Sequence, residues 1–312
     1  MPPESAAAGV ASRLASASGC TDVRLVATRR VGSRIVDDAT ALRRLADLPG
    51  VAAAVDAARQ ACTELRWHQA LRRRTAEARA ETTARAARAS AALDGAELPV
   101  DLVRDVLRGA RPAPDDAVGR TVAGAVRAVD LAQSTGDVVR SAPLQALARL
   151  HTAAAAGLVP DEALGRPRQG AEQPLDLPGP GAAPRGTELA DRLSGVSAVL
   201  SAPGEVPALL VAAIAHGELL TIRPFVAGNG VVARAVFRAV VVQRGLDPTG
   251  VAIPESALAA SGLPPYVSAL RGYASGTPDG VAQWLVGCAD AVRRGAGYGV
   301  EVADAVLAGR LT

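Results

Sequence analysis

The chain has 312 residues, which is enough for one large domain or two small ones. Apolar residues make up 49% of it but aromatic residues only 2%, so the core must be built from Ala, Val and Leu. The 34 basic residues are all Arg and are nearly balanced by 31 acidic residues, whereas nucleic-acid-binding proteins concentrate basic charge. Because Ala is the best helix former, we expect an all-α protein. Because its basic charge is spread out and nearly balanced, we expect no nucleic-acid partner.

Cysteines and histidines are few and scattered. Cys20, Cys62 and Cys288 lie far apart without a CxxC pair, which predicts neither a disulfide framework nor a zinc site. The three histidines show no paired spacing, so we expect no metal site. The longest apolar stretch ends at His216 and is too short to span a bilayer. The first residues show no signal-peptide pattern. We therefore expect a cytoplasmic protein with reduced thiols and no membrane contact.

The first half of the chain is mainly helical by pattern. Residues 1–50 are a poorly defined segment in which only residues 23–31 look strand-like. Residues 51–92 contain neither Pro nor Gly and predict one long helix or a broken pair of helices. Its Arg and Glu residues predict a solvated face, with a nucleic-acid-binding stripe as the alternative. Further helices are expected at residues 100–107, from Asp115 and Asp116 to about residue 133, and from Pro143 to about residue 156 with Ser141 as N-cap.

Residues 158–188 are rich in Pro and Gly and predict a loop. The second half is helical again, with helices expected at residues 205–222, 229–245, 254–260, 265–274, 278–293 and 300–308. We therefore divide the chain into an N-terminal segment (1–50), an N-terminal helical region (51–157), the loop (158–188) and a helical core (189–312).

One segment, residues 223–234, is a candidate anion-binding site. Residues 223–234 read Arg-Pro-Phe-Val-Ala-Gly-Asn-Gly-Val-Val-Ala-Arg and lie between two predicted helices. Gly228, Asn229 and Gly230 predict a tight turn straight into a helix start, where free backbone N–H groups attract anions such as phosphate. Arg234, about one turn into that helix, could reach the same anion. The alternative is a simple helix–helix turn without a ligand.

This segment resembles the Fic motif, which is His-Pro-Phe, any residue, Asp or Glu, Gly-Asn-Gly-Arg, two further residues and Arg. The flanking residues 213–222 and 235–246, residues 265–270 with Trp284 and Leu285, and the earlier His151 and residues 165–168 are also similar to that family. The similarity covers roughly residues 50–310. It implies an all-α, Fic-like helical domain with an N-terminal helical extension.

A second stretch resembles the inhibitory motif of the same family, which is Ser or Thr, three residues, Glu, then Gly or Asn. Here Ser90, Asp94 and Gly95 match it, with Asp in place of Glu. In the family the acidic residue pairs with the second motif arginine, so the resemblance implies that Asp94 lies near Arg234. The alternative is that Asp94 only ends its helix.

Three working positions of the Fic motif are replaced. The family's histidine, its general base, is Arg223, and a guanidinium stays protonated and has no acceptor. The acidic residue that holds magnesium is Ala227, and a methyl group cannot ligate a hard cation. The first motif arginine is Val231. His216 is the nearest histidine by sequence, but it lies about two helical turns away and reads as structural.

We therefore expect no catalytic residue, and an anion or nucleotide site made by Gly228, Asn229, Gly230, Arg234 and Arg223. The sequence favours a catalytically impaired nucleotide-binding or regulatory pseudoenzyme. An active AMP transferase that modifies a protein hydroxyl through another base, and a helical interaction module without a ligand, are the alternatives. The ligand that the resemblance implies is ATP or ADP, and magnesium lacks its usual carboxylate. A protein partner of unknown identity and a homodimer are both compatible with the sequence.

Overall fold

The computed structural model describes residues 35–176 and 180–310, and in these ranges the chain is built from helices and loops without a β-strand. The only β-type pairing there is an isolated bridge between Ala156 and Val159. The strand-like run at residues 23–31 and Cys20 lie outside the described residues. The expectation of an all-α fold is confirmed.

The helices follow one another along the chain with mostly short connections. Three short 3-10 helices, η1 (Leu45–Asp47), η2 (Gln69–Arg72) and η3 (Asp161–Ala163), lie between longer elements. The α-helices are α3 (Ile35–Arg44), α4 (Val51–Arg66), α5 (Thr75–Leu93), α6 (Val100–Leu107), α7 (Ala117–Ser134), α8 (Val138–Ser141), α9 (Pro143–Ala155), α10 (Gly186–Leu200), α11 (Ala208–Ile222), α12 (Asn229–Gln243), α13 (Pro254–Ser261), α14 (Leu263–Ser275) and α15 (Pro278–Leu307).

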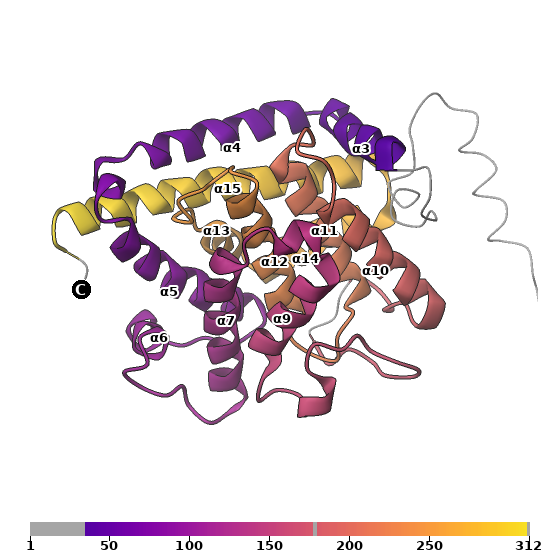
Figure 1. The fold of residues 1–312 in the computed structure, drawn as a ribbon, viewed down its shortest axis with the longest axis horizontal. Coiled ribbons are helices and arrows are strands. Elements are labelled where there is room, and N and C mark those ends of the chain that lie inside the picture. The colour runs from indigo at the N-terminus through magenta and orange to yellow at the C-terminus, as the bar shows by residue number, and fades with distance from the viewer. Residues whose placement is uncertain (1–34, 177–179, 311–312) are drawn as a thin grey trace, which may run out of the picture.

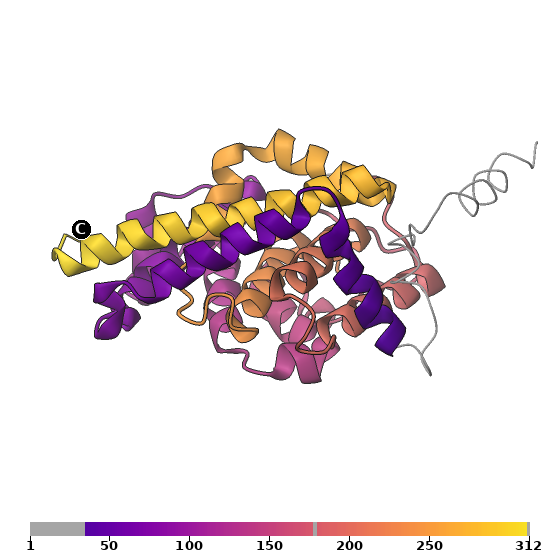
Figure 2. The same cartoon turned by 90° about the horizontal axis from the view of Figure 1, so that it is seen from above.

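Helix α12 lies in the middle of the bundle. It packs on α11, α7, α9 and α5, while α11 also contacts α15 and α14 (Figure 1). Helix α4 runs alongside α15 and covers it, as the view from above also shows (Figure 2). One apolar core extends from Ala39 in α3 to Val306 in α15, so helices from both halves of the chain share it. Every residue of α12 from Asn229 to Val241 is buried.

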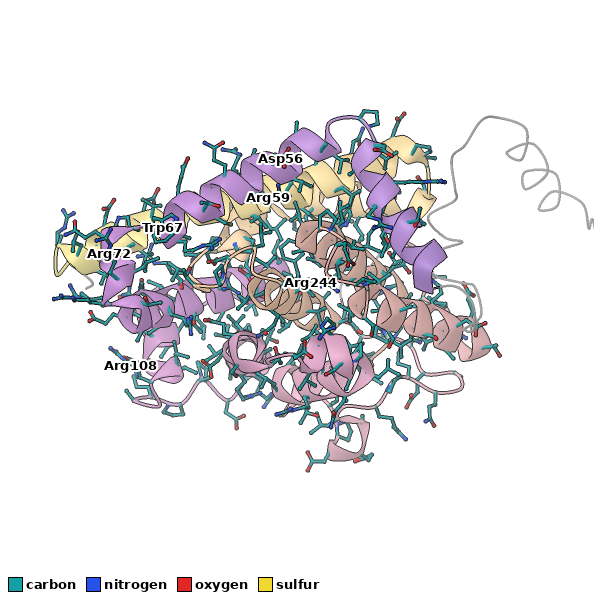
Figure 3. All side chains as sticks on the ribbon, turned by 45° about the horizontal axis from the view of Figure 1, so that its top comes forward. Asp56, Arg59, Trp67, Arg72, Arg108 and Arg244 are labelled. Carbon is teal, nitrogen blue, oxygen red and sulfur yellow. The ribbon has the colours of Figure 1, made fainter. Side chains whose placement is uncertain are left out.

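The predicted stretch at residues 51–92 is a broken pair of helices, which was one of the two alternatives. Helix α4 ends at Arg66, and Trp67 next to it is 70% exposed (Figure 3). The side chain of His68 accepts a hydrogen bond from Ala70 N and so caps η2, which redirects the chain into α5. A side-chain N-cap can therefore begin a new helical turn, and so break a long helix, without Pro or Gly.

The helices differ from the sequence expectation at several places. Ser141 is the last residue of α8 and not an N-cap of α9, because its hydroxyl donates to the carbonyl of Asp137 within its own helix. Helix α10 was not predicted. Helix α11 starts at Ala208 rather than residue 205, since Pro207 has an extended backbone.

The C-terminal region is one continuous helix, α15, and the expectation of two helices was wrong. The glycines near residue 297 do not break it because two of them are contact points. A Cβ added at Gly295 would lie 2.5 Å from Pro254 N, and one at Gly299 would lie 2.7 Å from Val251 O. These glycines let the segment before α13 approach α15 closely, and tertiary packing overrides their low helix propensity.

The described helices include none that combines the length and the apolar character needed to cross a bilayer.

We predict that Gly295→Ala destabilises the protein by about 1–3 kcal/mol, because the added methyl would overlap backbone atoms of Ile253 and Pro254. The matched control is Gly297→Ala in the same helix, where a Cβ meets nothing within 4 Å. This control should be neutral or stabilising by up to about 1 kcal/mol. Urea denaturation of the two variants measures both effects, and equal stabilities would contradict the packing role of Gly295.

Candidate functional site

The loop between α11 and α12 begins and ends with left-handed backbone. Arg223, the C-cap of α11, has φ 44°, and it is the one non-glycine residue with positive φ among those described. This conformation costs about 1–2 kcal/mol for a residue that has a Cβ. Gly228, the N-cap of α12, has φ 78° and adopts the same region without that cost. The surrounding contacts must therefore hold Arg223 in place.

Asn229 closes the loop with its side chain. Its Oδ1 accepts a hydrogen bond from Phe225 N at 2.8 Å, and its Nδ2 donates to Phe225 O at 2.8 Å. The amide thus mimics a paired strand and satisfies both polar backbone groups of a buried residue. The loop leads directly into the first turn of α12, as the sequence predicts.

A carboxylate lies at the start of α12. Asp176 Oδ1 accepts from Gly228 N at 2.8 Å, and Asp176 Oδ2 accepts from Asn229 Nδ2. Burial and the negative charge of Asp94 raise the pKa of Asp176 to about 6, against the hydrogen bonds from Asn229 and Gly228. The donors that a phosphate would use are therefore bound to an anion from the chain itself.

Arg223 is directed at the backbone and not at a reacting group. Its Nη2 donates to the carbonyl of Gly181, its Nε is buried without a hydrogen-bond partner, and the residue is 8% exposed. Burial lowers the pKa of Arg223, while the negative charge of Asp176 opposes that shift. A guanidinium remains protonated under these conditions and has no lone pair to accept a proton.

Arg168 holds the end of α11. Its Nε donates to Arg223 O at 2.8 Å, its Nη2 donates to Ile222 O at 3.1 Å, and its backbone N donates to Pro224 O at 2.7 Å. A cation that bonds the last carbonyls of a helix stabilises the helix C-terminus. Arg168 thus helps to hold the strained backbone of Arg223.

His151 supports the loop from α9 but is not available as a base. It stacks on Phe225 with ring centroids 3.9 Å apart. Its Nδ1 accepts from Gly165 N at 2.9 Å, so the other nitrogen carries the proton and donates to Ala227 O at 3.1 Å. Burial lowers the pKa of His151 to about 4. Both nitrogens of this neutral ring are engaged in backbone contacts.

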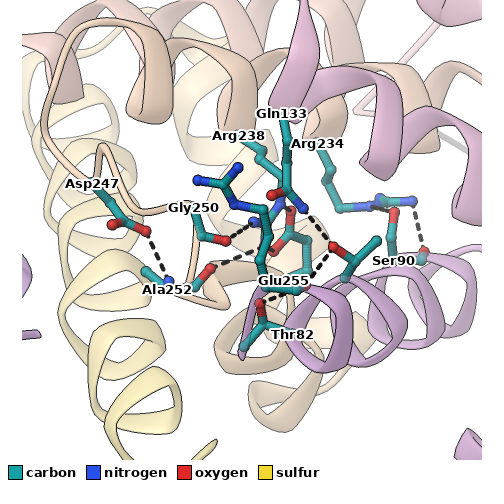
Figure 4. Close-up of polar contacts among 11 residues, drawn as sticks. Thr82, Ser90, Gln133, Arg234, Arg238, Asp247, Gly250, Ala252 and Glu255 are labelled. Atoms are coloured by element: carbon teal, nitrogen blue, oxygen red, sulfur yellow. Dashed lines mark hydrogen bonds and ion pairs between the residues drawn. The ribbon is translucent and has the colours of Figure 1, made fainter. Parts of the chain in front are cut away.

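Asp94 and Arg234 form the contact that the resemblance implies. Arg234 Nη2 lies 2.9 Å from Asp94 Oδ1, and the arginine is 1% exposed. Arg234 also donates to Ser90, through Nε to Oγ at 2.9 Å and through Nη2 to the carbonyl O at 2.8 Å (Figure 4). Burial by itself would lower the pKa of Arg234, but the charge of Asp94 raises it above its usual value.

Asp94 also lies against the first turn of α12. A Cβ added at Gly230 would lie 2.2 Å from Asp94 Oδ1, so only glycine permits this approach. Gly95, with φ 81°, turns the chain away after Asp94. Two carboxylates, Asp94 and Asp176, therefore approach the same helix start from different segments.

The next arginine along α12 is also paired inside the protein. Arg238 Nη2 lies 2.6 Å from Glu255 Oε2, and both side chains are 2% exposed. Arg238 further donates to the carbonyls of Gly250 and Ala252 (Figure 4). Because a buried charge needs a partner, this pair fixes α12 against the first turn of α13, and the two carbonyl bonds fix it against the segment before α13.

His216 lies in an aromatic cluster and not in the loop. Its Nε2 is 2.7 Å from the hydroxyl of Tyr266, and its ring packs against Phe237 and Trp284. Burial and the charge of Arg234 lower its pKa to about 3. The side chain is part of the core, in agreement with the structural interpretation.

The structure therefore brings Gly228, Asn229 and Gly230 to one helix start. Arg234, one turn further along α12, bonds to Asp94 and Ser90. Arg223 is at the same loop, with its guanidinium bonded to Gly181. Sequence reasoning missed Asp176. A single aspartate in a Pro- and Gly-rich loop carries no pattern that indicates where it folds.

Solved structures with the same fold are Fic proteins. A Fic family protein from Desulfovibrio desulfuricans aligns with a TM-score of 0.63 at 21% identity, over 81% of this chain and 74% of that one. Fic-1 from C. elegans aligns with a TM-score of 0.57 at 17% identity, over 85% and 83% of the two chains. No protein-family model matches the sequence, and no curated protein does. The chain thus has a Fic-like fold.

We predict that Glu255→Gln destabilises the protein by about 3–5 kcal/mol, because it leaves the Arg238 guanidinium buried without its counter-charge. The matched control is Asp290→Asn, which removes one charge from the exposed pair with Arg293 and should cost at most about 1 kcal/mol. Chemical denaturation compares the two, and similar small losses would show that the buried pair does not anchor α12.

Proposed function

We propose that the chain is a catalytically impaired Fic-like protein that binds the phosphate groups of a nucleotide at the start of α12. One observation carries the proposal: Gly228 N and Asn229 Nδ2 already donate to a carboxylate, so this helix start accepts an anion. A nucleotide phosphate would use the same two donors, together with the positive end of the α12 dipole.

Impaired catalysis follows from the chemistry of the loop. The loss of a general base reduces a rate on the order of 10²–10⁴-fold. At the histidine position, Arg223 donates its hydrogen bond to Gly181 and can accept no proton. His151 and His216 do not replace it, because His151 has both nitrogens engaged and His216 is fully buried in the aromatic cluster.

Magnesium has no suitable ligand at the position that the Fic motif provides for it. Ala227 packs against a small apolar cluster that contains Ala155, Val159 and Ala163. Magnesium requires oxygen ligands in near-octahedral geometry, and a methyl group in apolar surroundings supplies none. Val231, at the first arginine position, is 2% exposed and also apolar. We therefore expect nucleotide binding that does not depend on magnesium.

The two alternatives are outcomes of one experiment. A transferase with another base would label a protein with nucleotide, and an interaction module without a ligand would bind no nucleotide. The Asp176 carboxylate on the two donors is a contact that a module without a ligand would also show.

We predict that ADP and ATP bind Asp94→Ala about tenfold more tightly than the wild type, with or without magnesium. The reason is that Asp94 places negative charge against the first turn of α12, and a charge at a helix terminus is worth up to about 2 kcal/mol. Titration calorimetry measures the affinity, and circular dichroism checks the fold of a variant in which Arg234 loses its carboxylate partner. Asn229→Ala serves as the binding-deficient control.

The same proteins incubated with labelled ATP should form no covalent product. Arg223→His combined with Ala227→Asp and Val231→Arg is the positive comparison, since it restores the side chains of the Fic motif. If the wild type labels a protein and Asn229→Ala does not, the proposal that catalysis is impaired is wrong. Absence of nucleotide binding in both the wild type and Asp94→Ala would overturn the binding reading.

A further inference from the structure

Besides the bonds of Arg168, residues 175–181 of the Pro- and Gly-rich loop make three contacts with the segment between α11 and α12. Leu175 N donates to Val226 O at 2.7 Å, the Asp176 carboxylate accepts from Gly228 and Asn229, and Gly181 O accepts from Arg223. The middle contact is of a different kind from the others, because it places a charged side chain on the donors that an external anion would use.

We propose that Asp176 is a built-in competitor for the anion site at the start of α12, so that an external anion binds there only when the Asp176 carboxylate leaves. This inference rests on the proposed function for the location of the ligand, but its test uses a simple anion and needs no nucleotide.

Competition follows from the number of donors. The Asp176 carboxylate accepts from Gly228 N through Oδ1 and from Asn229 Nδ2 through Oδ2, and the backbone of Asn229 also bonds to it. The second amide hydrogen of Asn229 is used by Phe225 O. No donor of this pair is left for a second anion, and two anions at hydrogen-bond distance from one N–H group would repel each other.

Two of the replaced motif positions suit this internal ligand. Ala227, the residue before Gly228, adds no second negative charge to the loop and packs with apolar neighbours. Arg223 supplies positive charge close enough to Asp176 that the carboxylate opposes the lowering of the arginine's pKa. The departures at 223 and 227 thus favour a carboxylate at the place where the Fic motif would use a base and a metal.

The charges that face Asp176 oppose one another, so its carboxylate is not held strongly at the start of α12. Asp94 approaches from the end of α5 and opposes ionisation of Asp176, while Arg223 at the end of α11 and Arg168 in the loop favour it. Burial dominates the balance and raises the pKa of Asp176 to about 6. Burial therefore makes the ionised carboxylate of Asp176 less stable than it would be in water. An external anion then needs less binding free energy to replace it.

Sulfate tests the competition, because it stays a dianion above about pH 3 and so keeps its charge where proteins are stable. Calorimetric titration at pH 7.5 should show that Asp176→Asn and Asp176→Ala bind sulfate about tenfold or more tightly than the wild type. In these variants no carboxylate occupies the donors of Gly228 and Asn229, so the state that can bind an anion becomes the major one. Asp161→Asn is the matched control: it removes the same charge from an exposed residue of the same loop, and its affinity should equal the wild type. Adding Asn229→Ala to Asp176→Asn should abolish the gain.

A pH series tests the same inference without a variant. Between pH 8 and pH 5 the wild type should bind sulfate more tightly as the pH falls, because Asp176 takes up a proton around pH 6 and loses its charge. His151, with a pKa of about 4, stays neutral over this range, and the arginines stay charged. Asp176→Asn should show no such rise between the same pH values.

Equal sulfate affinity of the wild type, Asp176→Asn and Asp161→Asn would overturn the inference. So would a wild-type affinity that is the same at pH 8 and pH 5, which covers the case of a variant that does not fold. If Asp176→Asn binds sulfate more tightly but neither ADP nor ATP binds any variant, the competition stands and the nucleotide ligand is wrong.

Discussion

The start of α12 lies inside the protein, and its free backbone N–H groups must find partners there. A helix that begins at the surface can leave these groups to water, but Asn229 and the residues that follow it are buried. Asp176 accepts from Gly228 N at this helix start, and the side-chain amide of Asn229 satisfies the backbone of Phe225 in the loop before it. Much of the surrounding structure serves this one helix end: His151 supports the loop, and Arg168 holds its strained first residue.

Burial of α12 also sets the pattern of charges. The helix carries Arg234 and Arg238 into the interior, and each has a carboxylate from another segment, Asp94 or Glu255. Such pairs cost desolvation energy and contribute little net stability, but removal of one partner leaves the buried arginine without its ion-pair carboxylate. They therefore specify which segments lie beside α12. The Asp94 pair in particular brings the end of α5 over Gly230, next to the anion donors.

The sequence predicted the parts of the fold that depend on local pattern. The helix class, the turn at Gly228 and the helix that begins at Asn229 follow from composition and glycine chemistry, and the Asp94–Arg234 contact followed from the motif resemblance. It could not predict contacts set by tertiary packing. The sequence favoured two helices at 278–293 and 300–308, but Gly295 and Gly299 between them are close-packing positions of one helix, and Ser141 bonds within its own helix. Asp176 is the clearest case, because a loop aspartate finds its partners only when the whole chain is folded.

The motif residues that the chain keeps differ in kind from those it has replaced. Gly228 is needed for its left-handed backbone, Gly230 for the approach of Asp94, Asn229 for the closure of the loop, and Arg234 for its bonds to Ser90 and Asp94. Each would be required even in a protein without chemistry. The replaced positions, 223, 227 and 231, are those whose motif side chains act on a target, a metal or a phosphate. Folding therefore accounts for the presence of Gly-Asn-Gly and its arginine, and the replaced positions 223, 227 and 231 carry a guanidinium and two apolar side chains, none of which accepts a proton.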